Sequence, residues 1–347
     1  EVDALRADRF RIWGQEFTDV LLSLRQREAE GDWWLAAQNS WFEGELTLDN
    51  DLKVGDLKIA HVELAGLDSL ALSDKEGAGE PLELPDLAVS VAALRNDGLL
   101  LGELDFQLTT DGDMLTAQDI TADIAGLVLS AERPGSFSWQ QGDPASSQFK
   151  GLFTFTDLGE VFANLNYQRV LQSTRGSLKL DLQWPGGPQN FALASSQGEL
   201  LLKARDGRFL DAPEGASGTL RVVSLLNFAG VVRRLSLTHM FESGIPFDSV
   251  DAEAHLHSGT LEVNAIDVKG ASSGFRFAGL VDLDNAPEPQ TVDGELVVTL
   301  PVANNLPWVA ALAAGLPVAA GVFVVSKVFE KQVNRFSSGV YSITGNL

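Results

Sequence analysis

The stretch that decides the fold is residues 177–184, with the sequence SLKLDLQW. Within it, Leu178, Leu180 and Leu182 alternate with Lys179 and Asp181. Successive side chains of a β-strand point to opposite faces, so this spacing gives one apolar face and one polar face. The stretch therefore predicts a strand that is buried on one side only.

The same alternation recurs along most of the chain, with turn signals between the runs. Three further runs place apolar residues on one face: Leu104, Phe106 and Leu108; Phe149, Phe153 and Phe155; Phe275, Phe277, Val281 and Leu283. Turn signals stand at residues 96–98 (NDG), 111–112 (DG), 185–188 (PGGP) and 206–207 (DG). At Ala265-Ile266 the apolar phase shifts by one residue, which indicates a β-bulge.

These runs predict a mainly β fold. A loose similarity in pattern between residues 10–48 and residues 101–139 indicates a repeated strand unit. We therefore predict an elongated, curled antiparallel β-sheet built of repeated strand units and forming a groove. A few short helices and a C-terminal apolar helical segment complete the predicted fold.

Composition excludes several classes of protein. The chain has 347 residues, with 48 Asp plus Glu, 25 Lys plus Arg, a formal net charge of −23 and no cysteine. Without cysteine there is no disulfide framework and no Cys-ligated metal site. So acidic a chain lacks the basic surface that nucleic acid binding requires. The 45% of hydrophobic residues is sufficient for a folded core, so general disorder is excluded.

Three segments have helical spacing. Residues 156–172 contain Asp157 as an N-cap, and residues 220–232 precede Arg233 and Arg234, where the helix dipole favours cations. Residues 306–336 include a long apolar run, and no charged residue lies between Glu295 and Lys327.

The apolar run at residues 306–336 admits three interpretations. It is long enough to cross a bilayer, although prolines and glycines interrupt it. It also fits a helical hairpin or cap over apolar protein surface, or a helix in a membrane interface. The residues expected to make the cap or membrane contact are Trp308, Leu312, Leu316, Val322, Phe323 and Phe329.

The residues that match motifs for catalysis or metal binding are explained more simply as parts of turns and strands. Residues 270–274 (GASSG) match the G-x-S-x-G pattern of serine hydrolases, but that motif needs a helix after the turn and alternation predicts a strand on both sides. His255 and His257 share a strand face with Asp251 and Glu253, which is typical of a solvated polar face. No phosphate-binding loop or dinucleotide fingerprint is present. We therefore predict no enzyme, no catalytic residues, no cofactor and no metal.

Several short blocks follow one another in the second half of the chain. A double arginine, Arg233-Arg234, precedes a Phe247-Asp248 turn. A glycine-led strand pair follows from Gly259 to Gly279, and a closing segment runs from Pro301 to residues 341–345 (YSITG). In this order the blocks resemble the C-terminal region of the AsmA-like, YhdP-type envelope proteins of Gram-negative bacteria.

The first half of the chain is similar to the preceding strand repeats of that family, more loosely. The similar residues are Trp13-Gly14, Asp32-Trp33 and residues 101–104 (LGEL). The resemblance implies a groove that carries phospholipid between the inner and outer membranes across the periplasm, within a longer protein anchored in the inner membrane. The chain begins at Glu1 without a methionine or a signal peptide, which agrees with a piece of a longer polypeptide.

The sequence itself gives an independent reason for a groove. Alternating strands produce an apolar face that a second layer must cover, and the predicted helices are too few to do so. A lipid could cover it instead. The expected lining residues are Phe10, Ile12, Leu104, Phe106, Leu108, Phe153, Phe155, Leu178, Leu180, Leu182, Phe275 and Phe277. The alternative is an acidic β-solenoid or sandwich, a scaffold or adhesin with a closed core that binds no lipid.

We divide the chain into three parts by these patterns. Residues 1–150 are expected to form the repeated strand units, and residues 151–300 a C-terminal groove region with two helices. Residues 301–347 are expected to form the apolar helical cap and the final strand. The expected partners are phospholipid and, through residues 306–336, a membrane.

Overall fold

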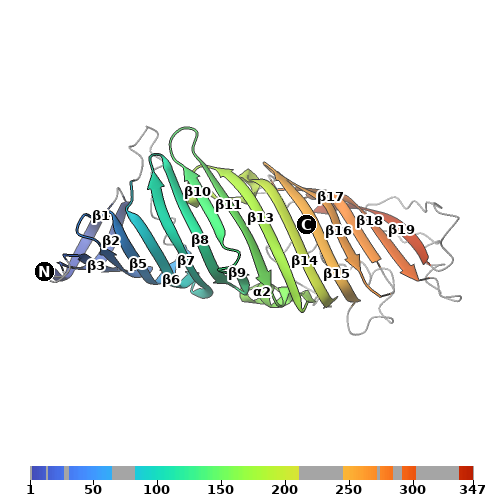
Figure 1. Ribbon diagram of the computed structural model, residues 1–347. Coiled ribbons are helices and arrows are strands. Elements are labelled where there is room, and N and C mark those ends of the chain that lie inside the picture. The colour runs from blue at the N-terminus through green and yellow to red at the C-terminus, as the bar shows by residue number, and fades with distance from the viewer. Residues whose placement is uncertain are drawn as a thin grey trace. The chain divides into compact units, whose positions relative to one another are not determined.

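The computed structural model describes residues 2–12, 15–26, 31–64, 83–210, 245–271, 274–283, 291–301 and 336–346. In this part the chain forms nineteen β-strands in one sheet, a short α-helix and two 3-10 turns (Figure 1). It divides into two compact units, Glu1–Phe153 with Asp181–Ala192 and Thr154–Leu180 with Leu193–Leu347. The prediction of a mainly β fold is confirmed, while the three predicted parts of the chain stay predictions.

The first unit contains the strands up to β11, apart from the last two residues of β11. Their bounds are β1 Val2–Ile12, β2 Gln15–Gln26, β3 Trp33–Gln38, β4 Phe42–Leu48, β5 Val54–Glu63, β6 Asp86–Asn96, β7 Leu99–Asp111, β8 Met114–Ile124, β9 Leu127–Leu129, β10 Gly135–Gln140 and β11 Ser146–Phe155. From β1 to β8 each strand pairs with the next one along the chain. β9 and β10 both pair with β8, and β10 also pairs with β11.

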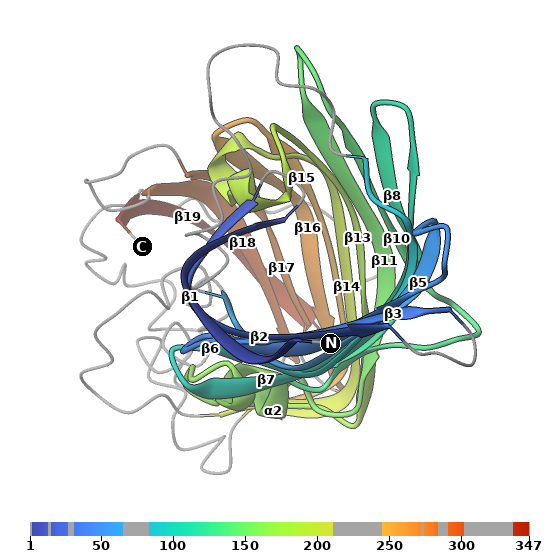
Figure 2. The ribbon, with the colours of Figure 1, turned by 90° about the vertical axis from the view of Figure 1, so that its left-hand side faces the viewer.

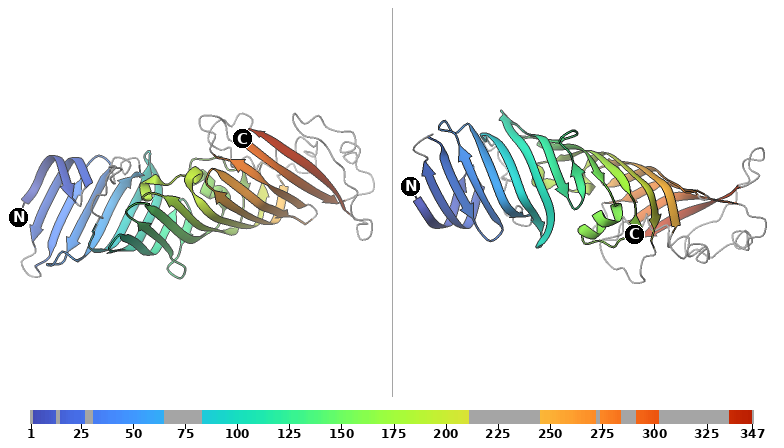
Figure 3. Two further views of the ribbon diagram at one scale, coloured as in Figure 1. Left: turned by 90° about the horizontal axis from the view of Figure 1, so that it is seen from above. Right: turned by 60° about the horizontal axis from the view of Figure 1, so that its bottom comes forward.

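The second unit contains the later strands and the helix, apart from residues 181–185 of β13, which belong to the first unit. Their bounds are α2 Leu158–Asn164, β12 Leu171–Gln172, β13 Arg175–Pro185, β14 Gln197–Phe209, β15 Ile245–His257, β16 Thr260–Lys269, β17 Gly274–Asp282, β18 Thr291–Pro301 and β19 Phe336–Asn346. Of the two 3-10 turns, Pro188–Asn190 lies in the first unit and Leu193–Ser195 in the second. The strands from β14 to β19 are paired in chain order and can be followed from yellow-green to red in both views of Figure 3.

One pairing corrects the prediction of an antiparallel sheet. β5 and β6 run parallel, with Leu57 opposite Val89 and Ile59 opposite Val91. A parallel pair cannot be joined by a tight hairpin and needs a connection of about a dozen residues or more. Residues 64–85 supply that length, so the sheet is mixed.

The sheet of the first unit curls. In Figure 2, β2 and β3 run across the view, whereas β8 and β10 stand upright beside β5. A bulge contributes in β8, where Asp119 has a positive φ of 52° and the register to β7 shifts. Bulges increase local twist, so this one bends the sheet while keeping Ile120 buried.

A second bulge confirms the phase shift predicted near Ala265. Glu253 pairs with Ala265 and Ala254 pairs with Val263, so that Asn264 is the extra residue of β16. Because of this extra residue, Val263 and Ile266 are both buried although they are three positions apart.

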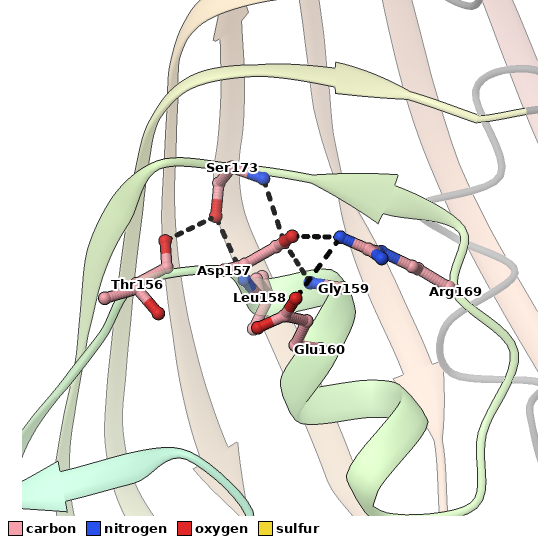
Figure 4. Close-up of polar contacts among 7 residues, drawn as sticks. All are labelled: Thr156, Asp157, Leu158, Gly159, Glu160, Arg169 and Ser173. Atoms are coloured by element: carbon pink, nitrogen blue, oxygen red, sulfur yellow. Dashed lines mark hydrogen bonds and ion pairs between the residues drawn. The ribbon is translucent and has the colours of Figure 1, made fainter.

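Helix α2 is shorter than the sequence predicted. Asp157 is its N-cap, as expected, and the Asp157 carboxylate accepts hydrogen bonds from the backbone N–H groups of Gly159 (2.8 Å) and Ser173 (3.0 Å). The Leu158 N–H donates to the Ser173 hydroxyl at 3.0 Å, and Arg169 pairs with Asp157 (Figure 4).

The predicted helix over 156–172 therefore ends early. Residues 171–172 form β12, whose Leu171 pairs with Phe209 of β14. Ladder pairing and the side-chain contacts of Asp157 hold this segment against the sheet, and these override its helical spacing. The helix predicted over 220–232 and the apolar segment over 306–336, with Trp308, Leu312, Leu316, Val322, Phe323 and Phe329, lie outside the described residues.

Candidate functional site: the apolar face of the sheet

Apolar side chains form continuous rows across the strands of the first unit. Strand register places them opposite one another, so each row runs from strand to strand, at right angles to the chain. The first row is Leu22, Ala37, Gly44, Ile59, Val91, Leu104, Ala122 and Leu129, in β2 to β9. Such cross-strand pairs are the unit of sheet stabilisation, and here they extend over eight strands.

Two more rows flank the first along the strands. The middle row is Leu24, Leu35, Leu46, Leu57, Val89 and Phe106, in β2 to β7. The third row is Trp33, Leu48, Gly55, Leu87, Leu108, Ala117, Phe137 and Phe149, in β3 to β8, β10 and β11. Neighbouring rows are about 6.8 Å apart, because two residues separate them along each strand.

The opposite face of the same strands is polar. One row on that face is Glu45, Lys58, Ser90, Asp105 and Thr121. Glu45, Lys58 and Asp105 are exposed, whereas Leu46 and Val89 beside them on the apolar face are buried. The alternation predicted from the sequence therefore separates two chemically distinct faces.

Equivalent rows cross β14 to β19 in the second unit. The clearest is Leu202, Ala252, Ile266, Phe277, Leu296 and Tyr341. A parallel row is Ala204, Val250, Val268, Phe275, Val298 and Gly339. Burial raises the pKa of the Tyr341 phenol, as expected for a hydroxyl at the end of an apolar row.

The degree of burial varies from residue to residue along this face in both units. In the first unit, Leu57 and Phe106 are half-buried, and at its β1 edge Leu5 is 53% exposed. In the second unit, Phe277 is 2% exposed and Leu296 is fully buried. The face is therefore partly accessible at Leu57 in β5 and Phe106 in β7, although Leu46 and Val89 beside them are buried, and it is covered at Phe277 and Leu296 in β17 and β18.

The groove residues predicted from the sequence also differ in burial, and this difference does not follow the two units. Leu104, Phe106, Leu108, Phe153, Leu178 and Leu180 are half-buried, whereas Phe155, Leu182, Phe275 and Phe277 are buried. Phe10 and Ile12 lie in β1, opposite Phe17 and Gln15, and their side chains are outside the described part. Their role as lining residues stays a prediction.

Sequence reasoning missed the residues of β3 to β6, such as Leu35, Leu46, Leu57 and Val89. These strands also alternate, so the signal was present. It was weaker because Gly44 and Gly55 occupy apolar-face positions and reduce the hydrophobicity of each run.

Several phenyl rings of this face lie against glycines. A Cβ atom added to Gly176 would meet the Phe155 ring at 2.2 Å, and one added to Gly294 would meet the Phe277 ring at 2.8 Å. Rings that cover glycines in this way restore the packing that the missing side chain leaves out. The rings therefore fill the gaps that the glycines would otherwise leave in this face.

A shallow hollow of about 350 Å³ lies at the ends of β4 to β7 in the first unit. Its apolar wall includes Leu48, Leu87 and Leu108 from the third row. Its remaining lining is polar: Asp32, Thr47, Asp49, Asp56, Asp86, Gln107 and Thr109, with Val54, Gly55 and Ala88. Apolar face and solvent therefore meet at this point.

The described ranges give little indication of metal binding or of a membrane-spanning helix. Their His, Asp and Glu side chains form no group that could hold a metal ion. His255 and His257 stack at 6.1 Å between ring centroids, and His257 lies 3.4 Å from Glu262 on the polar face. None of the helices in the described ranges is long and apolar enough to span a membrane.

The GASSG segment has a strand on each side, as predicted. β16 ends at Lys269 and β17 begins at Gly274, so no helix follows the serines. The strand-to-helix geometry of a hydrolase nucleophile is therefore missing at this turn.

Comparison with known proteins agrees with the resemblance seen in the sequence. No curated protein and no solved structure matches the chain. The family described as YhdP protein matches residues 3–347, nearly the full length of the chain. The chain therefore belongs to the YhdP protein family.

Proposed function

We propose that this chain is a lipid-carrying segment of an envelope protein, in which acyl chains lie on the apolar face of the sheet. The observation that carries the proposal is the set of apolar rows across β2 to β9, whose side chains are partly accessible in the first unit. Membership of the YhdP family supports a role in envelope lipid transport.

The free energy of burying an acyl chain favours movement of a lipid along the face over tight binding at one position. Burying a methylene group stabilises by about 0.8 kcal/mol, so a sixteen-carbon chain gains on the order of 10 kcal/mol relative to water. The same chain gains almost nothing relative to a bilayer. A face of similar apolarity from strand to strand therefore offers a path without a deep trap, and the headgroup stays in water.

The proposed lipid is a phospholipid moving between the inner and outer membranes across the periplasm. The chain would be the periplasmic part of a longer, membrane-anchored protein. Residues 306–336 would contact a membrane or cap the path. Liposome flotation of the chain with and without these residues tests that contact, and equal flotation would argue against it.

The first test is mass spectrometry of detergent-free protein after organic extraction. Co-purified phospholipid at one or more molecules per chain supports an acyl-binding face. A clean mass, with no lipid taken up from added vesicles, supports instead a closed scaffold that binds no lipid.

The second test places probes on the two faces. The chain has no cysteine, so single substitutions can carry an environment-sensitive fluorophore. We expect labels at Leu57→Cys and Phe106→Cys to shift to the blue when phospholipid vesicles are added. Labels at the neighbouring positions Lys58→Cys and Asp105→Cys, on the polar face, are the matched controls. Equal shifts at all four positions would contradict binding to the apolar face.

A further inference from the structure

A fourth row crosses the first unit beside the third row, one residue inside the strand ends. It contains Thr110, Leu115, Trp139 and Ser147, and we call it the rim row. Its members share the face of Leu108, Ala117, Phe137 and Phe149, because two residues separate them along each strand.

Two polar atoms of the rim row are buried without a hydrogen-bond partner. They are the Thr110 Oγ1 atom and the Trp139 Nε1 atom. The third polar side chain of the row is satisfied, since the Ser147 hydroxyl donates to the Gly186 carbonyl at 2.9 Å. A buried polar group without a partner is costly, and a native structure seldom keeps one without a reason.

Two other indoles of the chain have a hydrogen-bond acceptor. Trp34 Nε1 donates to the Glu45 carboxylate at 3.2 Å, and Trp184 Nε1 donates to the Gly187 carbonyl at 2.9 Å. Trp139 thus differs from both. Thr110 and Trp139 are each half-buried as residues, but their two polar atoms have almost no exposed surface. A ligand on this face would therefore have to displace the neighbouring groups that cover these atoms.

The position of the two atoms indicates which ligand group would meet them. On one side of the rim row lie the three apolar rows, which suit acyl chains. On its other side are the strand ends, which meet solvent at the hollow that Leu108 and Thr109 line. In a diacyl lipid, ester carbonyls stand between the acyl chains and the headgroup. Those carbonyls accept hydrogen bonds, and an indole N–H and a hydroxyl donate them.

We propose that Trp139 Nε1–H and Thr110 Oγ1–H donate hydrogen bonds to the ester carbonyls of a diacyl lipid whose acyl chains lie on the apolar rows. This inference rests on the proposed function. It adds a polar subsite that sets how far the lipid sinks into the sheet face.

The test compares ester-linked phosphatidylcholine with its ether-linked analogue, which has the same acyl-length chains and no carbonyls. Binding is measured with vesicles of each lipid and the Leu57→Cys fluorophore. We expect the otherwise unchanged chain to bind the ester form about five- to tenfold more tightly, as one or two hydrogen bonds would give. Trp139→Phe and Thr110→Val, which keep shape and remove the donors, should each reduce this ratio, and the double variant should abolish it.

Trp34→Phe is the matched control, because it removes an indole N–H on the polar face and should leave the ratio unchanged. If the chain binds both lipids equally, the subsite is wrong and the proposed function stands. If it binds neither lipid, both fail.

A second measurement needs no lipid. Trp139→Phe removes an unpaired donor and should leave the urea unfolding midpoint unchanged or higher, whereas Trp184→Phe removes a made hydrogen bond and should lower it. An equal drop in both variants would mean that Trp139 already has a partner such as water, and would overturn the subsite.

Discussion

Where a phenyl ring lies against a glycine, adding a single Cβ atom to that glycine would disturb the packing. At Gly294 a Cβ would stand 2.6 Å from the Ala278 carbonyl oxygen and 2.8 Å from the Phe277 ring. Neither can retreat, because the backbone is paired and Phe277 is buried. The local shape of the face is therefore set by the absence of a side chain.

Gly294→Ala tests this packing. We expect the free energy of unfolding to fall by about 1–3 kcal/mol, the usual cost of overpacking. Gly274→Ala on the adjacent strand is the control, since its Cβ would have no neighbour nearer than 3.7 Å. Urea unfolding of both variants gives the comparison, and similar losses would show that ring packing is not the cause.

Tyr341 gives a pH dependence whose direction is fixed by burial. Its pKa is raised by desolvation above the ordinary value of about 10, so the folded chain holds the phenol proton more tightly than the unfolded chain. The resulting stabilisation is complete below about pH 10 and decreases as the pH rises through the folded pKa.

The chain has two tyrosines, which makes the effect separable. Tyr167→Phe keeps Tyr341 and should lose stability steeply in urea unfolding above about pH 10, and its phenolate absorbance should develop later than that of a free tyrosine. Tyr341→Phe should lose this component of the alkaline decline. Identical pH profiles for the two variants would argue against the burial of Tyr341.

At the scale of elements, α2 shows how a short helix is held at the sheet. A helix of seven residues has little stability of its own. Its Asp157 cap also receives the Ser173 N–H and pairs with Arg169, so one carboxylate ties the helix start to the following segment. The cap is therefore a tertiary contact as much as a helical one.

Asp157→Ala should lower the free energy of unfolding by about 1–2 kcal/mol, as the loss of a helix cap does. The amides of Gly159 and Ser173 should then exchange with solvent faster. Asp157→Asn keeps an acceptor oxygen and loses only the charge toward Arg169, so it should cost less. Unchanged exchange at both amides in Asp157→Ala would refute this role of the carboxylate.

For individual elements, the alternation of apolar and polar residues predicted strands correctly. It did not predict the relative direction of paired strands. β13 and the second half of β7 were predicted from the sequence because Leu178, Leu180 and Leu182, and likewise Leu104, Phe106 and Leu108, each have a polar neighbour on both sides. The parallel pair β5–β6 could not, because strand direction depends on a connection whose path the local pattern does not encode. The length of α2 was overestimated because Leu165 and Val170 keep helical spacing while β12 pairs with β14.

The candidate site was predictable only in outline. Leu104, Phe106 and Leu108 were identified because their run alternates without interruption. The rim row was not, because the unpaired state of Trp139 and Thr110 depends on neighbours from other strands. Likewise, no local signal shows that Phe277 is covered while Phe106 is partly open.

For the whole molecule, the formal charge of −23 is a source of self-repulsion in the compact state. Salt screens charges that lie more than about 8 Å apart at physiological ionic strength. We therefore expect the thermal midpoint to rise between low salt and about 0.5 M salt. Sodium and potassium chloride should act alike, whereas a gain with only one of them would point to specific ion binding.

We expect the parallel junction between β5 and β6 also to affect the order in which the strands assemble. It separates two stretches, β1–β5 and β6–β8, in which every pairing joins neighbours along the chain and can zip up locally. The junction itself requires β5 and β6, which residues 64–85 separate in the sequence, to meet first, and bringing together strands so far apart along the chain costs entropy before any contact is made. The two meanders should therefore form early and merge late, which makes the β5–β6 seam the slow step in the maturation of the first unit.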